Sequence, residues 1–230
     1  MTISENIAAI REKMAAAARE AGRENAEILL VGASKMNDAD ACRAAIAAGI
    51  DALGENRVQE MTAKLAEDAY TGAPLHFIGH LQRNKVKQVV GRVDLIQSVG
   101  SPELLSEIEK AAGKLGIVQD ILLEVNVGLE EAKSGFAPAE VEAAAAQALS
   151  CPHVRVRGLM TIPPAEASRE ENCGYFRQVH ALYVDINAKL FHNDFKYLSM
   201  GMSGDYEDAI RCGATMVRVG SAIFGARHYT

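Results

Sequence analysis

Short hydrophobic runs alternate with amphipathic segments along almost the whole chain. Eight of these runs are mostly apolar at consecutive positions, as is typical of parallel strands that are buried on both faces. The strands predicted in this way cover residues 28–34, 50–54, 75–79, 93–99, 121–127, 154–160, 195–198 and 215–219. Helices are predicted to follow them over residues 38–48, 55–67, 82–90, 102–115, 138–149, 170–190 and 205–212, with a short closing segment at 223–230.

Eight strand-then-helix units predict the α/β class and, within it, a (β/α)8 TIM barrel. A doubly wound open sheet is the alternative, but such a sheet usually has fewer strands and would need a ligand loop early in the chain. An extra N-terminal helix is predicted to about residue 22, because Thr2 and Glu5 match a capping box and Ile3, Ile7 and Ile10 recur at helical spacing. No linker or repeat divides the chain, so we expect one domain over residues 1–230.

Composition and charge narrow the classes of function. The chain has 230 residues, of which 49% are hydrophobic and 23% charged, as in ordinary soluble proteins. A net charge of −6 argues against nucleic-acid binding, no apolar run approaches the ~20 residues that span a bilayer, and the N-terminus lacks a signal-peptide pattern. Four cysteines without a Cys-x-x-Cys pair predict reduced thiols, no metal site and a cytoplasmic protein. We expect a monomer, because no large apolar stripe remains once the barrel is assigned.

One basic cluster stands out against this acidic background. It consists of Arg83, Lys85, Lys87 and Arg92. A solvated helix face explains the cluster, and a docking surface for an anionic partner is the alternative. The sequence leaves both interpretations open.

Two turns rich in small residues follow the last two predicted strands. TIM barrels often hold phosphate groups at the loops after strands seven and eight, where unobstructed backbone N–H groups surround an anion. We call residues 199–205 and 220–221 together the anion cup. Its predicted ligand-binding residues are Ser199, Met200, Ser203, Gly204, Gly220 and Ser221. The alternative is that these are ordinary tight turns.

Lys35 follows the first strand and is predicted to point into the barrel mouth. Desolvation would lower the pKa of its amine and favour Schiff-base formation, although a solvated lysine at a strand end is the alternative. Arg218 lies within the eighth strand and must find acceptors, either in an ion pair with Glu124 or Glu55 or on a bound ligand. A lysine aldimine with an anchored phosphate is the binding mode of pyridoxal 5′-phosphate (PLP), whose ring nitrogen Arg218 would then approach.

Four further residues stand at predicted strand ends. Asn56 follows the second strand and is placed to hydrogen-bond near the ring of a bound cofactor. His80 ends the third strand, where a lone histidine is more often structural than catalytic. Asn126 and Met160 end the fifth and sixth strands and are predicted to line the mouth.

Several motifs together resemble the pyridoxal phosphate homeostasis protein family, once labelled proline synthetase co-transcribed homologues. They are ASK at 33–35, GENRVQE at 54–60, HFIGHLQRNK at 76–85, KSG at 133–135, GLMTIPP at 158–164, LSMGMSGD at 198–205 and VRVGSAIFG at 217–225. The resemblance implies a fold-type III barrel like the N-terminal domain of alanine racemase, with PLP held on Lys35. It also implies buffering or delivery of PLP to PLP-dependent apo-enzymes, with no established catalytic activity. Met36-Asn37 departs from the family, in which Thr-Lys-Pro is commoner.

Two enzymatic alternatives are weaker. A fold-type III enzyme such as an amino-acid racemase resembles this barrel but adds a C-terminal β-domain, and this sequence ends directly after the eighth unit. A Schiff-base aldolase usually carries its lysine on a later strand than Lys35. We therefore expect a non-enzymatic holder of PLP, without catalytic residues.

Overall fold

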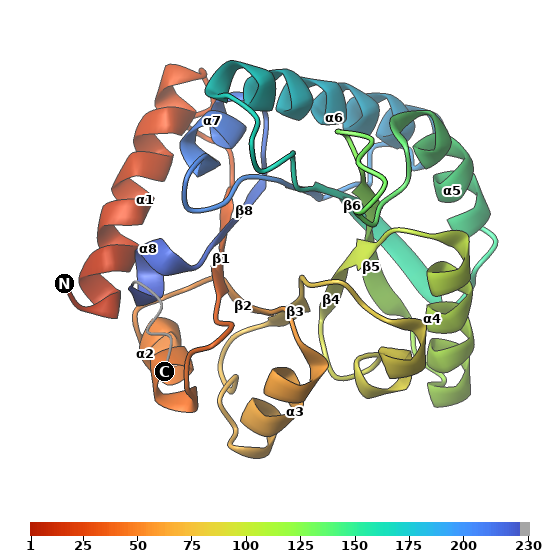
Figure 1. The fold of residues 1–230 in the computed structure, drawn as a ribbon, viewed down its shortest axis with the longest axis horizontal. Helices are drawn as coiled ribbons and strands as arrows, with labels where there is room; N and C mark the ends of the chain where they lie inside the picture. Colours follow the sequence, from red (N-terminus) through yellow and green to blue (C-terminus); the bar gives the residue numbers. More distant parts are fainter. Residues whose placement is uncertain (226–230) are drawn as a thin grey trace.

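The computed structural model describes residues 1–225, in which eight parallel strands close into a barrel (Figure 1). Each strand pairs with the next along the chain, and β1 closes the barrel by pairing with β8. The strands are β1 (Leu29–Ala33), β2 (Ala52–Glu55), β3 (Leu75–Phe77), β4 (Leu95–Val99), β5 (Gln119–Val125), β6 (Val154–Thr161), β7 (Tyr197–Ser199) and β8 (Met216–Val219). The predicted (β/α)8 barrel is confirmed, with each strand inside or within two residues of its predicted range.

Helices surround the strands as an outer ring (Figure 1). The α-helices are α1 (Ile3–Glu20), α2 (Ala39–Ala47), α3 (Val58–Ala66), α4 (Pro102–Leu115), α5 (Val141–Ala148), α6 (Arg169–Leu190), α7 (Tyr206–Arg211) and α8 (Ser221–Phe224). Two segments predicted as helices are not α-helical throughout. The segment after β3 is the 3-10 helix η1 (Arg83–Gln88), and the segment after β5 begins with the 3-10 turn η2 (Pro138–Glu140). Of the predicted closing segment at 223–230, residues 226–230 lie outside the described part of the chain.

The N-terminal helix α1 packs beside α7 and α8 (Figure 1). Its predicted capping box is present, since Thr2 and Glu5 cap each other. Its buried face carries Ile7, Ile10 and Met14, at helical spacing. Since α8 has only four residues, α1 supplies apolar cover that a longer eighth helix would give in a regular barrel.

The hydrophobic core has two layers. The larger layer fills the space between the strands and the surrounding helices. A smaller cluster inside the barrel consists of Val31, Ala52, Leu95, Leu122, Met160 and Met216. Polar side chains such as Gln97 and Arg218 are buried in the strands beside this inner cluster.

The described residues contain neither a membrane-spanning helix nor a cluster of metal-binding side chains. No helix within residues 1–225 has the length and apolar character needed to cross a membrane. Nor does that part of the chain bring together three or more His, Cys, Asp or Glu side chains in a group that could hold a metal ion.

Candidate functional site

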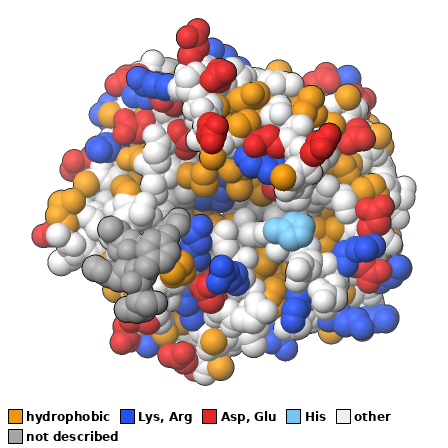
Figure 2. Space-filling view, viewed as in Figure 1, with side chains coloured by type: hydrophobic (Ala, Val, Ile, Leu, Met, Phe, Trp, Pro, Cys, Tyr) orange, Lys and Arg blue, Asp and Glu red, His pale blue; other side chains and the backbone are white. Residues whose placement is uncertain are grey.

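A cavity of about 400 Å³ lies beyond the carboxyl ends of β1 and β8. The register of the barrel places Val31 of β1 beside Arg218 of β8, so the chain that leaves β1 brings Lys35 to the same cavity. The cavity brings together the predicted residues Lys35, Ser203, Gly204, Arg218, Gly220 and Ser221. Figure 2 shows a hollow in this face of the molecule, with basic side chains within and beside it.

The first turn of the anion cup is shaped by hydrogen bonds at both of its ends. The carboxylate of Asp205 accepts from the N–H of Met202 at 2.6 Å, and the N–H of Asp205 donates back to the Met202 carbonyl. Gly201 has a φ of +91°, and a Cβ there would lie 2.6 Å from the Cβ of Ala209. Glycine is therefore needed where the turn packs against α7.

The second turn is joined to the first by a hydrogen bond. The N–H of Gly220 donates to Ser203 Oγ at 3.2 Å. Within residues 1–225, the N–H groups of Ser203, Gly204 and Ser221 donate to no other group. Three backbone donors thus remain available to an anion, next to the hydroxyl groups of both serines.

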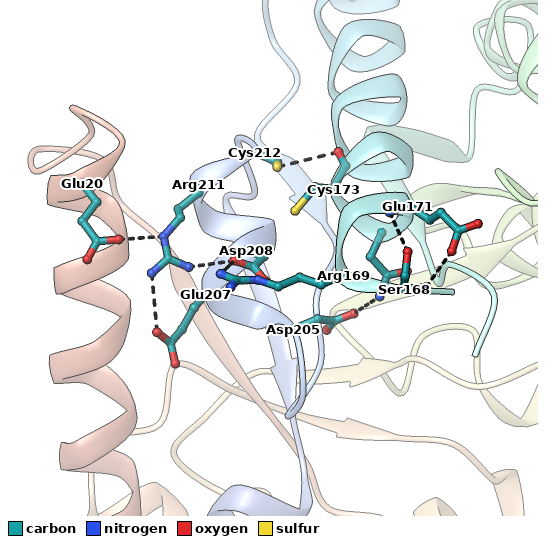
Figure 3. Close-up of polar contacts among 11 residues, drawn as sticks. Glu20, Ser168, Arg169, Glu171, Cys173, Asp205, Glu207, Asp208, Arg211 and Cys212 are labelled. Atoms are coloured by element: carbon teal, nitrogen blue, oxygen red, sulfur yellow. Dashed lines mark hydrogen bonds and ion pairs between the residues drawn. The ribbon is translucent and has the colours of Figure 1, made fainter. Parts of the chain in front are cut away.

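The helix that follows the first turn is tied to its neighbours on two sides (Figure 3). Arg169 at the start of α6 donates twice to Asp208 of α7, at 2.6 Å each. Arg211 of α7 donates to the same carboxylate at 2.8 Å and to Glu20 of α1 at 2.7 Å. These contacts are partly exposed and individually weak, but as a network they fix α7 and with it the end of the turn.

Arg218 is buried between β7 and β6. Its Nη1 donates to Ser199 Oγ at 2.5 Å and its Nη2 to the Thr161 carbonyl at 2.9 Å. Burial lowers the pKa of Arg218 to about 10, and the charges of Glu124 and Asp205 oppose this shift. Neither Glu124 nor Glu55 forms an ion pair with Arg218 within the described residues, so that structural alternative is wrong. The guanidinium is instead held by neutral oxygen atoms at the wall of the cavity.

A buried polar cluster behind Lys35 was not predicted from the sequence. Glu55 Oε1 accepts from Ser34 Oγ at 2.6 Å, from Lys64 Nζ at 2.6 Å and from the hydroxyl of Tyr70 at 3.0 Å. Lys64 Nζ also donates to the Ser34 carbonyl at 2.7 Å. The residue before Lys35 is therefore held by both its side chain and its backbone. The one sequence signal was a lysine on the otherwise apolar face of α3, three residues after Met61.

Two residues predicted for the anion cup do not line the cavity. The N–H of Met200 donates to the Met216 carbonyl, and its side chain is buried in the outer core. Ser199 is fully buried, and its hydroxyl is used by Gln97 and Arg218. Both residues belong to the pairing of β7 with β8 rather than to the turn that follows it.

The remaining predicted residues occupy other places. Asn56 and exposed His80 line a neighbouring cavity of about 520 Å³, in which Asn56 Oδ1 is buried without a hydrogen-bond partner among the described residues. Asn126 is not among the residues that line the cavity at Lys35, and its side chain bonds both backbone groups of Glu130 and shapes the loop there. Met160 is fully buried in the inner cluster, so it does not reach the rim.

Comparisons with known proteins agree with this geometry. The family model of the alanine racemase N-terminal domain matches residues 6–228. A pyridoxal phosphate homeostasis protein of Aquifex aeolicus is 41% identical and covers 100% of both chains. The protein of that name from Escherichia coli K12 is 37% identical, over 99% of this chain and 98% of its own.

Solved structures show the same relationship. PipY of Synechococcus elongatus with PLP bound superposes with a TM-score of 0.84 at 33% identity, over 97% of this chain and 100% of PipY. An alanine racemase of Clostridium difficile has a TM-score of 0.71 at 19% identity, and the match covers 98% of this chain but 58% of the racemase. From its full-length relatives and its barrel, this chain belongs to the pyridoxal phosphate homeostasis protein family, which shares the fold of the alanine racemase N-terminal domain.

Proposed function

We propose that this protein binds PLP through Lys35 and serves in PLP homeostasis, by buffering the cofactor or delivering it to PLP-dependent apo-enzymes. The observation that carries the proposal is the meeting of Lys35, Arg218 and the anion cup in one cavity. A lysine and an anion cup at the same cavity offer a covalent link for the aldehyde and hydrogen bonds for the phosphate. The names of the full-length relatives and the PLP held by PipY support this assignment.

The residues present fit the three functional groups of PLP. The phosphate would be held by the N–H groups of Ser203, Gly204 and Ser221, which have no other acceptor among the described residues. Lys35 would hold the aldehyde carbon, and Arg218 would donate to the ring nitrogen. Bound PLP supplies an electron-withdrawing ring, which is strongest when its nitrogen carries a proton. An arginine at that nitrogen would keep it unprotonated, which favours binding of the cofactor without catalytic turnover.

We further propose that the protein acts as a cytoplasmic monomer without catalytic turnover. Delivery requires that the covalent link to Lys35 be reversible and that PLP reach the surface. The cavity allows this because Met202, Gly204 and Ser221 at its rim are exposed. Transfer to an apo-enzyme would then be detected as gain of activity by that enzyme, at a rate set by release from Lys35.

The central experiment identifies the attachment site. Purified protein is titrated with PLP, followed by visible absorbance, reduced with borohydride and digested for peptide mass mapping. The modified peptide is expected to contain Lys35, and Lys35→Ala is expected to abolish the coloured complex. Lys110→Ala, which removes an exposed lysine of α4, is the matched control and should bind like the wild type. A protein that stays colourless in excess PLP, or a label on another lysine, contradicts the proposal.

A second experiment separates a holder from a racemase. The PLP-loaded protein is incubated with amino acids in deuterated water, and the α-proton signal of each amino acid is followed by NMR. We expect no exchange above that of free PLP. Exchange that exceeds this background and disappears in Lys35→Ala would instead establish an enzyme.

A further inference from the structure

A chain of hydrogen bonds crosses the interior of the barrel from β8 to β3. Arg218 Nη1 lies 2.5 Å from Ser199 Oγ on β7, and Ser199 Oγ lies 2.6 Å from Gln97 Oε1 on β4. Gln97 Nε2 lies 2.9 Å from Nδ1 of His76 on β3. All four side chains are less than one tenth exposed, so water does not compete for these bonds.

The direction of every bond in this chain follows from the arginine. A guanidinium only donates, so Ser199 Oγ must accept from Arg218 and its single proton must go to Gln97 Oε1. The amide group of Gln97 then presents its two N–H bonds to His76 Nδ1 and to the sulfur of Met216. His76 accepts at Nδ1 and is therefore the neutral tautomer with its proton on Nε2. Reversing the bond between Ser199 and Gln97 would leave the buried hydroxyl proton of Ser199 without an acceptor.

We infer that Gln97, Ser199 and His76 form a positioning relay that holds the guanidinium of Arg218 in the orientation required at the ring nitrogen of bound PLP. The inference rests on the proposed function for its ligand and on the contacts above for its geometry. Gln97 and His76 are not among the residues that line the cavity, and they act through Ser199. The anion cup holds one end of the cofactor, whereas the relay fixes the group that faces the other end.

The relay explains why three polar side chains occupy the barrel interior instead of the hydrophobic residues that usually fill it. Without Ser199, the guanidinium would keep only its bond to the Thr161 carbonyl and could rotate about its terminal bonds. Ser199 in turn is oriented by Gln97, because a hydroxyl without that acceptor would be free to turn its proton elsewhere. The positions on β3, β4 and β7 thus determine the electronic state of a ligand attached after β1.

The first measurement uses the protein without PLP. Nitrogen-15 NMR of the arginine side chains is recorded for the wild type, Gln97→Leu and Ser199→Ala, with the Arg218 signals assigned from Arg218→Lys. A held guanidinium gives separate, slowly exchanging Nη signals, and we expect these to merge in both relay variants. Ser199→Thr keeps the hydroxyl and should retain them. Gln119→Leu removes a buried glutamine at the start of β5, away from the relay, and is the matched control.

The second measurement uses the PLP complex. We expect both relay variants to keep the covalent link to Lys35, to show a shifted visible absorbance maximum and to bind PLP up to about tenfold more weakly, as for one lost hydrogen bond. Separate Nη signals and a wild-type spectrum in Gln97→Leu and Ser199→Ala would overturn the relay. Merged signals with an unchanged spectrum would overturn its role toward the cofactor. If wild-type protein binds no PLP, the proposed function fails, whereas the NMR comparison still decides whether the relay holds Arg218.

Discussion

Lys64 and Glu55 form a buried ion pair directly behind Ser34, the residue that precedes Lys35. Lys64 Nζ lies 2.6 Å from Glu55 Oε1, and their side chains are 8% and 0% exposed. The second carboxylate oxygen of Glu55 has no hydrogen-bond partner among the described residues, so the charge of Lys64 is its main compensation. The link between α3 and β2 therefore depends on both charges being present.

Replacing Lys64 with Met is expected to destabilise the protein strongly. The change leaves the Glu55 carboxylate buried without its counter-charge, and such losses amount to about 3–5 kcal/mol of unfolding free energy. Urea unfolding followed by circular dichroism measures the loss. Lys110→Met breaks an exposed pair with Glu107 and should cost about 0.5 kcal/mol or less. Equal losses in the two variants would show that the buried pair contributes no more than a surface contact.

Acid is expected to destabilise the protein through His76. Burial lowers the pKa of this imidazole from 6.5 to about 4. Above about pH 6.5 it is neutral in both states, and between about pH 6.5 and 4 only the unfolded chain gains a proton, so stability falls as pH falls. The full loss is about 3 kcal/mol, at about 1.4 kcal/mol for each unit of pKa shift.

The contribution of His76 is isolated by comparing variants. Burial raises the pKa values of Glu124 and Asp205, which has the opposite effect on stability in acid, so the wild-type curve alone does not report on His76. His76→Gln should lose stability less steeply than the wild type between about pH 6.5 and 4.5 in urea unfolding. Exposed His192→Gln is the control and should follow the wild type. Parallel curves for His76→Gln and the wild type would contradict the prediction.

Removing the hydroxyl of Ser203 is expected to weaken PLP binding. Ser203 Oγ links the two turns of the anion cup through Gly220, and its hydroxyl proton remains available for an anion. A hydrogen bond to a charged group contributes about 1.5–3 kcal/mol, so Ser203→Ala should raise the Kd for PLP by about tenfold or more. Inorganic phosphate should also compete with PLP more weakly in Ser203→Ala than in the wild type. An unchanged Kd would show that the phosphate of PLP does not bind at this turn.

Gly201 is expected to tolerate no side chain. Its φ of +91° and the 2.6 Å approach of a Cβ to Ala209 predict that Gly201→Ala loses at least about 1–3 kcal/mol of stability. The comparison is Gly174→Ala in α6, where a Cβ meets nothing within 4 Å and helix propensity predicts a gain of about 0.5–1 kcal/mol. Thermal unfolding of both variants and the wild type measures the two changes in stability. A stable Gly201→Ala protein would show that the turn can shift away from α7.

The sequence alone determined the barrel, because buried parallel strands and amphipathic helices leave different periodicities in the chain. It also located the turns after β7 and β8 and the lysine after β1, since strand ends in such a barrel converge on one face. Lys35, Ser203, Gly204, Arg218, Gly220 and Ser221 follow from that rule, and the structure brings them to one cavity. Each of these residues is marked by a local signal in the sequence, and the regular geometry of the barrel brings them together.

Only the tertiary structure decided which way each side chain faces and what it meets. Met200 and Ser199 stand beside the anion cup in sequence, yet strand pairing turns both into the protein. Gln97 lies in none of the motifs and His76 only opens the one at 76–85, where nothing marks its role; both join Ser199 because the closed barrel brings β3, β4 and β7 around one interior. Lys64 reaches Glu55 in the same way, across the layer between α3 and the strands. Such partners are fixed by packing in three dimensions, which the spacing of residues along the chain does not encode.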